Sequence, residues 1–152
     1  MEDVLVVDDD GMILDLIKHI LESEGIVAHC VSSGAEALEK ITERTFSLMI
    51  TDYNMPGLNG LELAIKGLEM APQMPIIMNT GDLSPNIARL AEEIGIAKVM
   101  AKPYLPSDMM ESIRAVVGKR SAPQSARPRE AMQAARRSLA SCSRQEGSGT
   151  GW

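Results

Sequence analysis

Aromatic side chains are scarce in this sequence, where Phe, Trp and Tyr make up 3% of 152 residues. A core built of stacked rings is therefore excluded, and the hydrophobic content of 45% comes mainly from aliphatic residues and 11 methionines. Methionine is flexible and fills irregular gaps between other side chains. Because a chain of this length accommodates one domain and an appendage, we expect a single aliphatic, Met-rich core.

Cysteines and long hydrophobic runs are also lacking. Cys30 and Cys142 are too far apart and too few to form a disulfide framework or a Cys-based zinc site, which fits a reducing compartment. No apolar run approaches the roughly 20 residues that cross a bilayer, and no basic leader precedes the first strand-like run. The sequence therefore predicts a cytoplasmic protein with no membrane span and no export signal.

Basic side chains are few in the first part of the chain. Residues 1–117 contain 8 Lys and Arg against 19 Asp and Glu, whereas residues 118–152 contain 7 against 2. The formal charge is therefore −11 on the first segment and +5 on the second. An acidic body repels nucleic-acid phosphates and attracts cations. We expect no direct DNA binding by residues 1–117.

Short apolar runs alternate with helix-like segments over residues 1–117. Strands are expected at 4–7, 26–30, 47–51, 75–79 and 98–101. The helices between them begin after residues of the N-capping type, namely Asp10, Ser33, Asn59 and Ser84. Glu36 stands three residues after Ser33, which is capping-box spacing. This alternation predicts a parallel sheet of five strands with five helices on its two faces.

Residues 118–152 have a different composition, rich in Ser, Ala, Arg and Gly and poor in large apolar side chains. Such a segment buries too little surface to offset the entropy lost on ordering. We expect this basic tail to be disordered or to form one short helix at 129–140, where Met132, Ala135 and Leu139 share a face. Residues 1–117 are then the folded domain.

Residues that suit phosphoryl transfer stand at the ends of four of the apolar runs. They are Asp8, Asp9, Asp52, Thr80 and Lys102. The carboxyl ends of parallel strands line one edge of a sheet, so these side chains are expected to meet in one crevice. Helix capping or surface exposure explains each residue singly, but not their coincidence at four strand ends.

The acidic residues of this crevice predict a bound cation. Two unit charges about 4 Å apart repel by roughly 4 kcal/mol at an effective dielectric constant near 20, and three carboxylates gather here. Lys102 alone does not offset this repulsion. Mg²⁺ is a hard cation that prefers carboxylate and carbonyl oxygens and shares its coordination with phosphoryl oxygens. We expect Mg²⁺ as the cofactor.

Four short motifs together resemble the receiver domain of bacterial two-component response regulators. They are Val4-Leu5-Val6-Val7-Asp8-Asp9, Asp52-x-Asn54-Met55-Pro56-Gly57, Thr80 and Lys102-Pro103. The resemblance covers residues 1 to about 117. It implies a doubly wound α/β fold, in which a five-stranded parallel sheet of order 2-1-3-4-5 and five helices make a flavodoxin-like three-layer sandwich.

The resemblance also implies roles for individual residues. Asp52 would be the phosphoacceptor and form an aspartyl phosphate. Asp8, Asp9, Asp52 and the backbone carbonyl of Asn54 would bind Mg²⁺.

By the same resemblance, Thr80 and Lys102 would bind the phosphoryl group, with the Thr80 hydroxyl acting as the switch. Receivers often have an aromatic residue three positions before the lysine, and here that position is Val99. We therefore expect phosphorylation without the usual aromatic coupling.

The resemblance implies partners as well. The phosphoryl donor would be a sensor histidine kinase or a histidine phosphotransfer protein. Residues 118–152 are too few for a DNA-binding output domain, so a stand-alone receiver is expected, with an unidentified downstream protein partner and possible homodimerisation. It would catalyse only its own phosphotransfer and dephosphorylation and would not be an enzyme in the ordinary sense.

Two alternatives stay open at this point. Asp8-x-Asp10-Gly11 after an apolar run resembles the first motif of haloacid-dehalogenase-type phosphatases, in which Asp8 would be the nucleophile and Asp10 the general acid and base. That reading leaves Asp52 and the loop after it without a role. The other alternative is a pseudo-receiver, a binding module whose partner affinity does not depend on phosphorylation.

Overall fold

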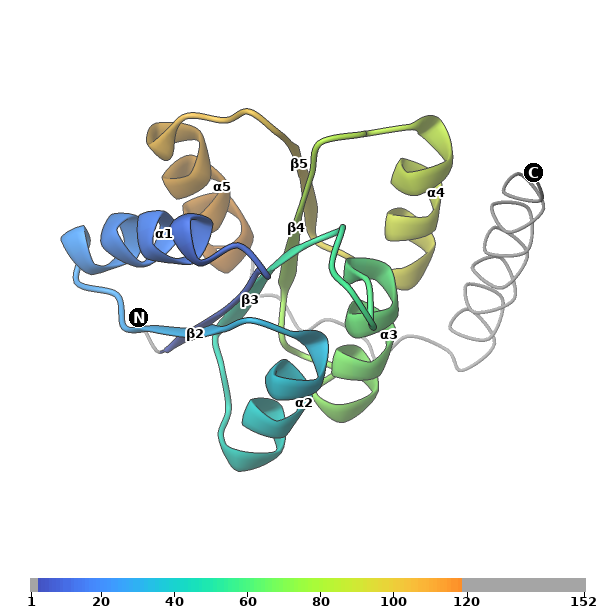
Figure 1. Ribbon diagram of the computed structural model, residues 1–152, viewed down its shortest axis with the longest axis horizontal. Coiled ribbons are helices and arrows are strands. Elements are labelled where there is room, and N and C mark those ends of the chain that lie inside the picture. Colours follow the sequence, from blue (N-terminus) through green and yellow to red (C-terminus); the bar gives the residue numbers. More distant parts are fainter. Residues whose placement is uncertain (1–2, 119–152) are drawn as a thin grey trace.

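The computed structural model describes residues 3–118 and contains five parallel strands in one sheet. The strands are β1 (Val4–Val7), β2 (Ala28–Val31), β3 (Leu48–Asp52), β4 (Ile76–Thr80) and β5 (Lys98–Ala101). They lie side by side in the order β2-β1-β3-β4-β5, with helices between them in the sequence (Figure 1). The predicted fold class and strand order are confirmed.

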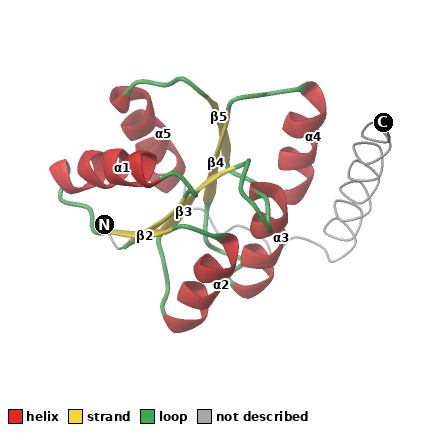
Figure 2. Ribbon diagram, viewed as in Figure 1, coloured by secondary structure: helices red, strands yellow, loops and turns green. Residues whose placement is uncertain are grey.

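Helices cover both faces of the sheet, which makes three layers (Figure 2). They are α1 (Gly11–Ser23), α2 (Gly34–Glu43), α3 (Gly60–Met70), α4 (Pro85–Ile94) and α5 (Pro106–Gly118). The side chains of α1 and α5 pack with one set of strand residues, and those of α2, α3 and α4 pack with the other set. Among the described residues, no helix combines the length and the apolar character needed to cross a bilayer.

Alternate residues of each central strand enter different halves of the core. In β1, Val4 and Val6 face α1 and α5, while Leu5 and Val7 face α2 to α4. Because both faces are covered, the central strands are apolar almost throughout, as buried parallel strands usually are. Seven methionines are at most 8% exposed in the described core, which agrees with the Met-rich aliphatic core that the composition predicted.

Most of the predicted helix starts are confirmed in detail. The Asp10, Ser33, Asn59 and Ser84 side chains each accept a hydrogen bond from a backbone N–H of the helix that follows. Asn59 and Glu62 form a complete capping box. Ser33 and Glu36 do not, because the Glu36 carboxylate accepts from the backbone and hydroxyl of Ser32 and not from the Ser33 backbone.

The second strand begins later than its sequence indicates. It was expected at 26–30 and runs from Ala28 to Val31. The backbone N–H of Ile26 donates to the Leu21 carbonyl and so helps to close the end of α1, following Gly25, whose φ is +75°. Pairing with β1 therefore starts only at Ala28, opposite Val4. The predicted helix at 129–140 lies outside the described residues.

Gly60 lets α3 approach the strand that carries Asp52. A Cβ atom at position 60 would lie 2.5 Å from the Asp52 carbonyl oxygen and 2.9 Å from the Tyr53 Cα. Both are backbone atoms, so a larger side chain can be accommodated only if α3 or the end of β3 moves.

We predict that Gly60→Ala lowers the free energy of unfolding by about 1–3 kcal/mol, the usual cost of overpacking. The control is Gly11→Ala, because nothing lies within 4 Å of a Cβ at that helix start; it should change stability by less than about 0.5 kcal/mol. Urea unfolding followed by circular dichroism measures both. Equal stability of the two variants would contradict this account of the contact.

Candidate functional site

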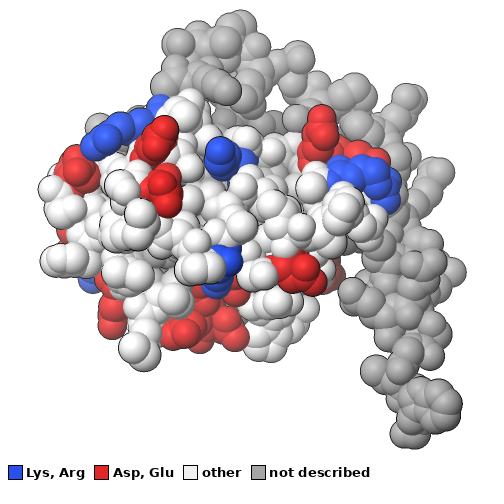
Figure 3. Space-filling view, turned by 90° about the horizontal axis from the view of Figure 1, so that it is seen from above, with Lys and Arg blue, Asp and Glu red and all other residues white. Residues whose placement is uncertain are grey.

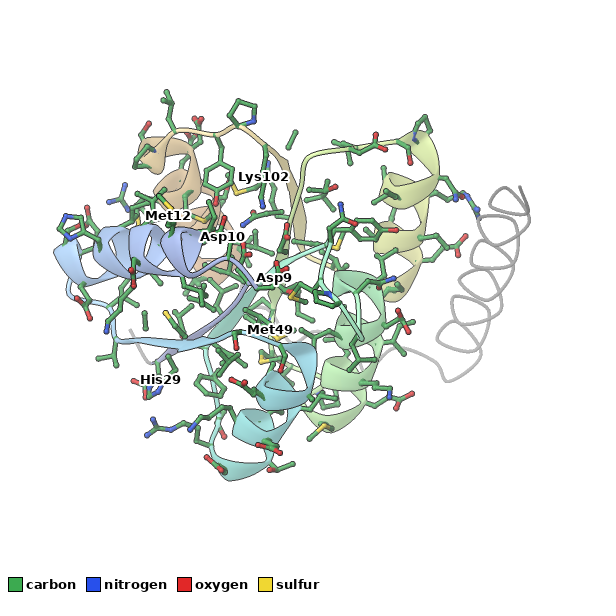
Figure 4. The ribbon with its side chains drawn as sticks, in the orientation of Figure 1. Asp9, Asp10, Met12, His29, Met49 and Lys102 are labelled. Carbon is green, nitrogen blue, oxygen red and sulfur yellow. The ribbon has the colours of Figure 1, made fainter. Side chains whose placement is uncertain are left out.

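Three carboxylates and one ammonium group meet at the carboxyl edge of the sheet. Asp8 follows β1, Asp52 ends β3, and Lys102 follows β5. The Lys102 Nζ atom lies 2.9 Å from Asp52 Oδ1 and 3.9 Å from Asp8 Oδ2. Figure 4 shows the labelled side chains of Asp9 and Lys102 at this end of the sheet, beside the start of α1. The structure therefore brings together residues that are 94 positions apart in the chain.

The three carboxylates differ in their exposure to water. Asp8 is 2% exposed and Asp52 is 7% exposed, whereas Asp9 is on the surface. Oxygen atoms of all three lie within 4.8 Å of one another. This arrangement leaves Asp9 accessible from solvent while the other two are held among protein atoms.

The Asp8 carboxyl is in the least favourable environment of the three. One of its oxygens accepts a hydrogen bond from the Asp10 backbone N–H at 2.9 Å, but the other, Oδ2, is buried with no hydrogen-bond partner in the described residues. Burial raises the pKa of Asp8 from 3.8 to about 6, and the Asp52 carboxylate adds to the rise, while the Asp10 N–H and Lys102 oppose it. The unpartnered oxygen is available to a ligand.

The set of donors fits a hard divalent cation. It consists of carboxylate oxygens, one of them buried and without a hydrogen-bond partner in the described residues, beside an exposed carboxylate through which an ion can enter. Mg²⁺ and Ca²⁺ both accept oxygen ligands, and Mg²⁺ is the one commonly shared with phosphoryl groups. Asn54 lies two residues beyond Asp52 on the following loop and is exposed.

The loop after Asp52 is fixed at both ends. Met55 is 8% exposed and packs into the core on the α2 to α4 side, and the Gly60 N–H donates to the Tyr53 carbonyl at 2.9 Å. Gly57 has a φ of +80°, a conformation that favours glycine. The segment that the sequence marked as a turn-rich loop is therefore held beside Asp52.

Thr80 ends β4 and is 1% exposed. Its hydroxyl accepts from the Asp82 backbone N–H at 3.1 Å and donates to the Asp82 carbonyl at 3.2 Å. Val99 is half-buried in β5 and packs with the core on the α2 to α4 side. In this structure the hydroxyl thus stabilises the turn that leads into α4.

Two polar residues near the site were not singled out from the sequence. Asn79 is 1% exposed, and its Nδ2 atom donates to the Tyr104 hydroxyl at 3.3 Å. Burial raises the pKa of Tyr104 to about 12, and the nearby Asp8 and Asp52 carboxylates contribute, so the phenol is protonated at neutral pH. Two signals were present in the sequence: an amide inside an apolar strand, and an aromatic residue two positions after Lys102.

Other charged residues lie apart from this site. His29, labelled in Figure 4, is on β2, and its Nε2 atom is 2.8 Å from Asp3 Oδ2. On the face shown in Figure 3, the Lys and Arg side chains of the described residues are scattered among acidic and uncharged ones.

The fold and the site define a class of protein. It is a doubly wound α/β domain whose acidic pocket lies where the strand order reverses, between β1 and β3. A family model described as the response regulator receiver domain matches residues 4–114. The chain belongs to this family, as its motifs predicted, and its members act in two-component signalling.

Individual relatives agree with this assignment. The response regulator receiver protein CpdR of Brucella abortus (strain 2308) is 31% identical over 113 residues, covering 74% of this chain and 94% of that protein. The transcriptional regulatory protein CpxR of Escherichia coli (strain K12) is 34% identical over 120 residues, covering 77% of this chain. The chain spans only half the length of CpxR.

Solved structures agree as well. The crystal structure of a CheY-like response regulator receiver domain protein from Methanospirillum hungatei JF-1 has a TM-score of 0.77 and 33% identity. It covers 80% of this chain and 97% of the other.

Family membership removes the support for the phosphatase alternative. The geometry agrees, because Asp10, the proposed acid and base of that alternative, accepts a hydrogen bond from the Met12 N–H at 2.9 Å and caps α1.

We predict that the Asp8 carboxyl destabilises the metal-free fold at neutral pH. Between its ordinary pKa of 3.8 and about 6, the folded state holds a proton that the unfolded state has released. The free energy of unfolding therefore falls as pH rises through this range, by about 2–3 kcal/mol for a shift of this size, and stays lower above it.

Asp8→Asn removes this effect. In EDTA at pH 8 the variant should be more stable than the unchanged protein by about 2 kcal/mol, and the difference should vanish near pH 4. Urea unfolding at several pH values measures it. Asp15→Asn, at an exposed position on α1, is the control and should follow the unchanged protein throughout. A destabilised Asp8→Asn at pH 8 would show that the carboxylate contributes favourably.

Proposed function

We propose that this receiver accepts a phosphoryl group on Asp52 from the phosphohistidine of a sensor histidine kinase or a histidine phosphotransfer protein. An Asp52 carboxylate oxygen attacks phosphorus, the P–N bond breaks as the P–O bond forms, and the imidazole leaves with the electron pair and takes up a proton. The observation that carries this proposal is the contact between Asp52 Oδ1 and the Lys102 ammonium group, with Asp8 and Asp9 beside them.

The residues around Asp52 divide the work of the transfer. Lys102 places a positive charge where the phosphoryl oxygens gather negative charge. Asp8, Asp9, Asp52 and the Asn54 backbone carbonyl are the groups that would hold Mg²⁺, which supplies further charge neutralisation when bound. Little covalent machinery is needed, because transfers of this kind depend on positioning and electrostatics. The chain would thus catalyse only its own phosphorylation and dephosphorylation.

Thr80 is proposed as the switch. Its hydroxyl is engaged with the Asp82 backbone in the described structure. If a phosphoryl oxygen on Asp52 accepts from this hydroxyl, the Asp82 carbonyl loses its donor and the turn before α4 can rearrange. Val99 offers no polar group to accompany that movement. A downstream protein partner, or a second copy of the chain, would recognise the rearranged surface in the cytoplasm.

We predict that acetyl phosphate with Mg²⁺ labels Asp52. Mass spectrometry of the intact chain and its peptides should find one phosphoryl group, absent from Asp52→Asn. Asp8→Asn should reduce labelling without moving it, because Asp8 is proposed to hold the cation. Label on Asp8 would restore the phosphatase alternative. Absence of label, also with histidine kinases as donors, would favour the pseudo-receiver.

We predict that Thr80→Ala separates phosphorylation from switching. Asp52 should still be labelled, but changes in the ¹H–¹⁵N spectrum on phosphorylation should stay in the pocket. In the unchanged protein they should extend through residues 80–84 into α4. Thr80→Ser keeps the hydroxyl and is the matched control, expected to respond like the unchanged protein. A full spectral response in Thr80→Ala would exclude this hydroxyl as the switch.

A further inference from the structure

Asn79 is the neighbour of Asp52 on the next strand. The two residues are paired across β3 and β4, and Asn79 is paired in turn with Met100 of β5. Paired residues of a parallel sheet point to the same face. Met100 belongs to the core on the α1 and α5 side, so the Asn79 amide lies on that side, next in the row after Asp52. An amide is thus buried directly beside the phosphoacceptor position.

The loop between β5 and α5 is attached to β4 at two points. The Lys102 backbone N–H donates to the Thr80 carbonyl at 2.8 Å. Two residues further on, the Tyr104 hydroxyl accepts from Asn79 Nδ2 at 3.3 Å. The first contact fixes the backbone of Lys102 and the second fixes the chain that follows it. The position of a lysine ammonium group depends on its backbone as well as on its side-chain rotamer. A firmly held backbone therefore narrows the range of positions that the ammonium group can take.

Asn79 is a costly residue at this position. Its Oδ1 atom is buried and has no hydrogen-bond partner in the described part of the chain. A buried polar group without a partner destabilises a fold, and an apolar side chain of similar size would avoid that cost. The contact with Tyr104 is the interaction that the amide provides and a leucine would not. This points to a role for the pair beyond packing.

We propose that Asn79 and Tyr104 form a positioning pair that holds the β5–α5 loop so that the Lys102 ammonium group stays on Asp52. Neither residue touches the reacting atoms in this proposal; both act through Lys102. The proposal deepens the function proposed above and rests on it for the effect on phosphorylation. Its effect on cation binding can be tested separately.

The experiment compares Tyr104→Phe, Asn79→Leu and the double variant. Tyr104→Phe leaves the buried Asn79 Nδ2 atom without its partner and should lower stability, whereas removing both polar groups should restore most of it. The rate of Asp52 labelling by acetyl phosphate at saturating Mg²⁺ should fall about tenfold in all three, because the lysine is no longer held in place. Recovery of both stability and rate in the double variant would reduce the pair to packing and overturn the proposal.

Mg²⁺ affinity gives a second measurement, and it should rise in the variants whose labelling rate falls. Lys102 contacts Asp52 and lies 3.9 Å from Asp8, so it competes with a cation for these carboxylates. Loosening the lysine should therefore tighten Mg²⁺ binding, roughly two- to threefold, in titrations followed by ¹H–¹⁵N spectra. General damage to the pocket would weaken binding instead and contradict the proposal. In a Lys102→Ala background, Tyr104→Phe should change Mg²⁺ affinity no further.

Leu105→Ala is the matched control on the same loop, since Leu105 is 65% exposed. It should label and bind Mg²⁺ like the unchanged protein. If neither the unchanged protein nor this control is labelled, the proposed function fails. The Mg²⁺ titrations then decide the pair alone: tighter binding in Tyr104→Phe, lost in the Lys102→Ala background, supports it, and unchanged or weaker binding overturns it.

Discussion

The contact between Lys102 and Asp52 is the interaction on which the rest of the site depends. Asp52 and Asp8 are both buried at the same end of the sheet, and their charges repel each other in an environment that screens them poorly. The Lys102 ammonium group, 2.9 Å from one and 3.9 Å from the other, is the described cation that compensates them. The pKa of Asp8 is raised mainly by burial and further by the Asp52 carboxylate, and Lys102 opposes this rise without cancelling it. A ligand that brings positive charge into the pocket would therefore reduce the repulsion between these carboxylates.

The fold tolerates this unfavourable cluster because the cluster lies at the edge of the sheet. Asp8 follows β1 and Asp52 ends β3, and the other residues of these strands are almost completely buried, so the aliphatic core supplies the stability that the pocket lacks. The parallel register sets where each side chain emerges, because β1, β3 and β4 are paired residue by residue up to the pocket. Gly60 then brings the start of α3 against the backbone of Asp52. The register of the sheet and the close approach of α3 thus set where the pocket residues lie, whereas Lys102 compensates their charge.

Much of this architecture was readable from the sequence because it depends on local signals. The helix caps at Asp10, Asn59 and Ser84 and the polar residues at strand ends are properties of short segments, and they were predicted correctly. The start of β2 was missed, since the Ile26 N–H donates to the Leu21 carbonyl at the end of α1, and this contact depends on how the turn at Gly25 folds. The apolar pattern of residues 26–30 does not show this contact.

The Asn79–Tyr104 contact could not be predicted from the sequence for a different reason. It joins a strand to a loop 25 positions away, and no local pattern connects the two residues. It also lies on the α1 and α5 side of the sheet, whereas Val99 packs on the other side with α2 to α4. Asp52 and Thr80 stand on neighbouring strands at the carboxyl edge of the sheet. If Asp52 is phosphorylated as proposed, the response of each layer of helices would depend on what the strands offer next to the pocket. Here the side of α1 and α5 offers an amide and a phenol, and the other side offers an aliphatic residue.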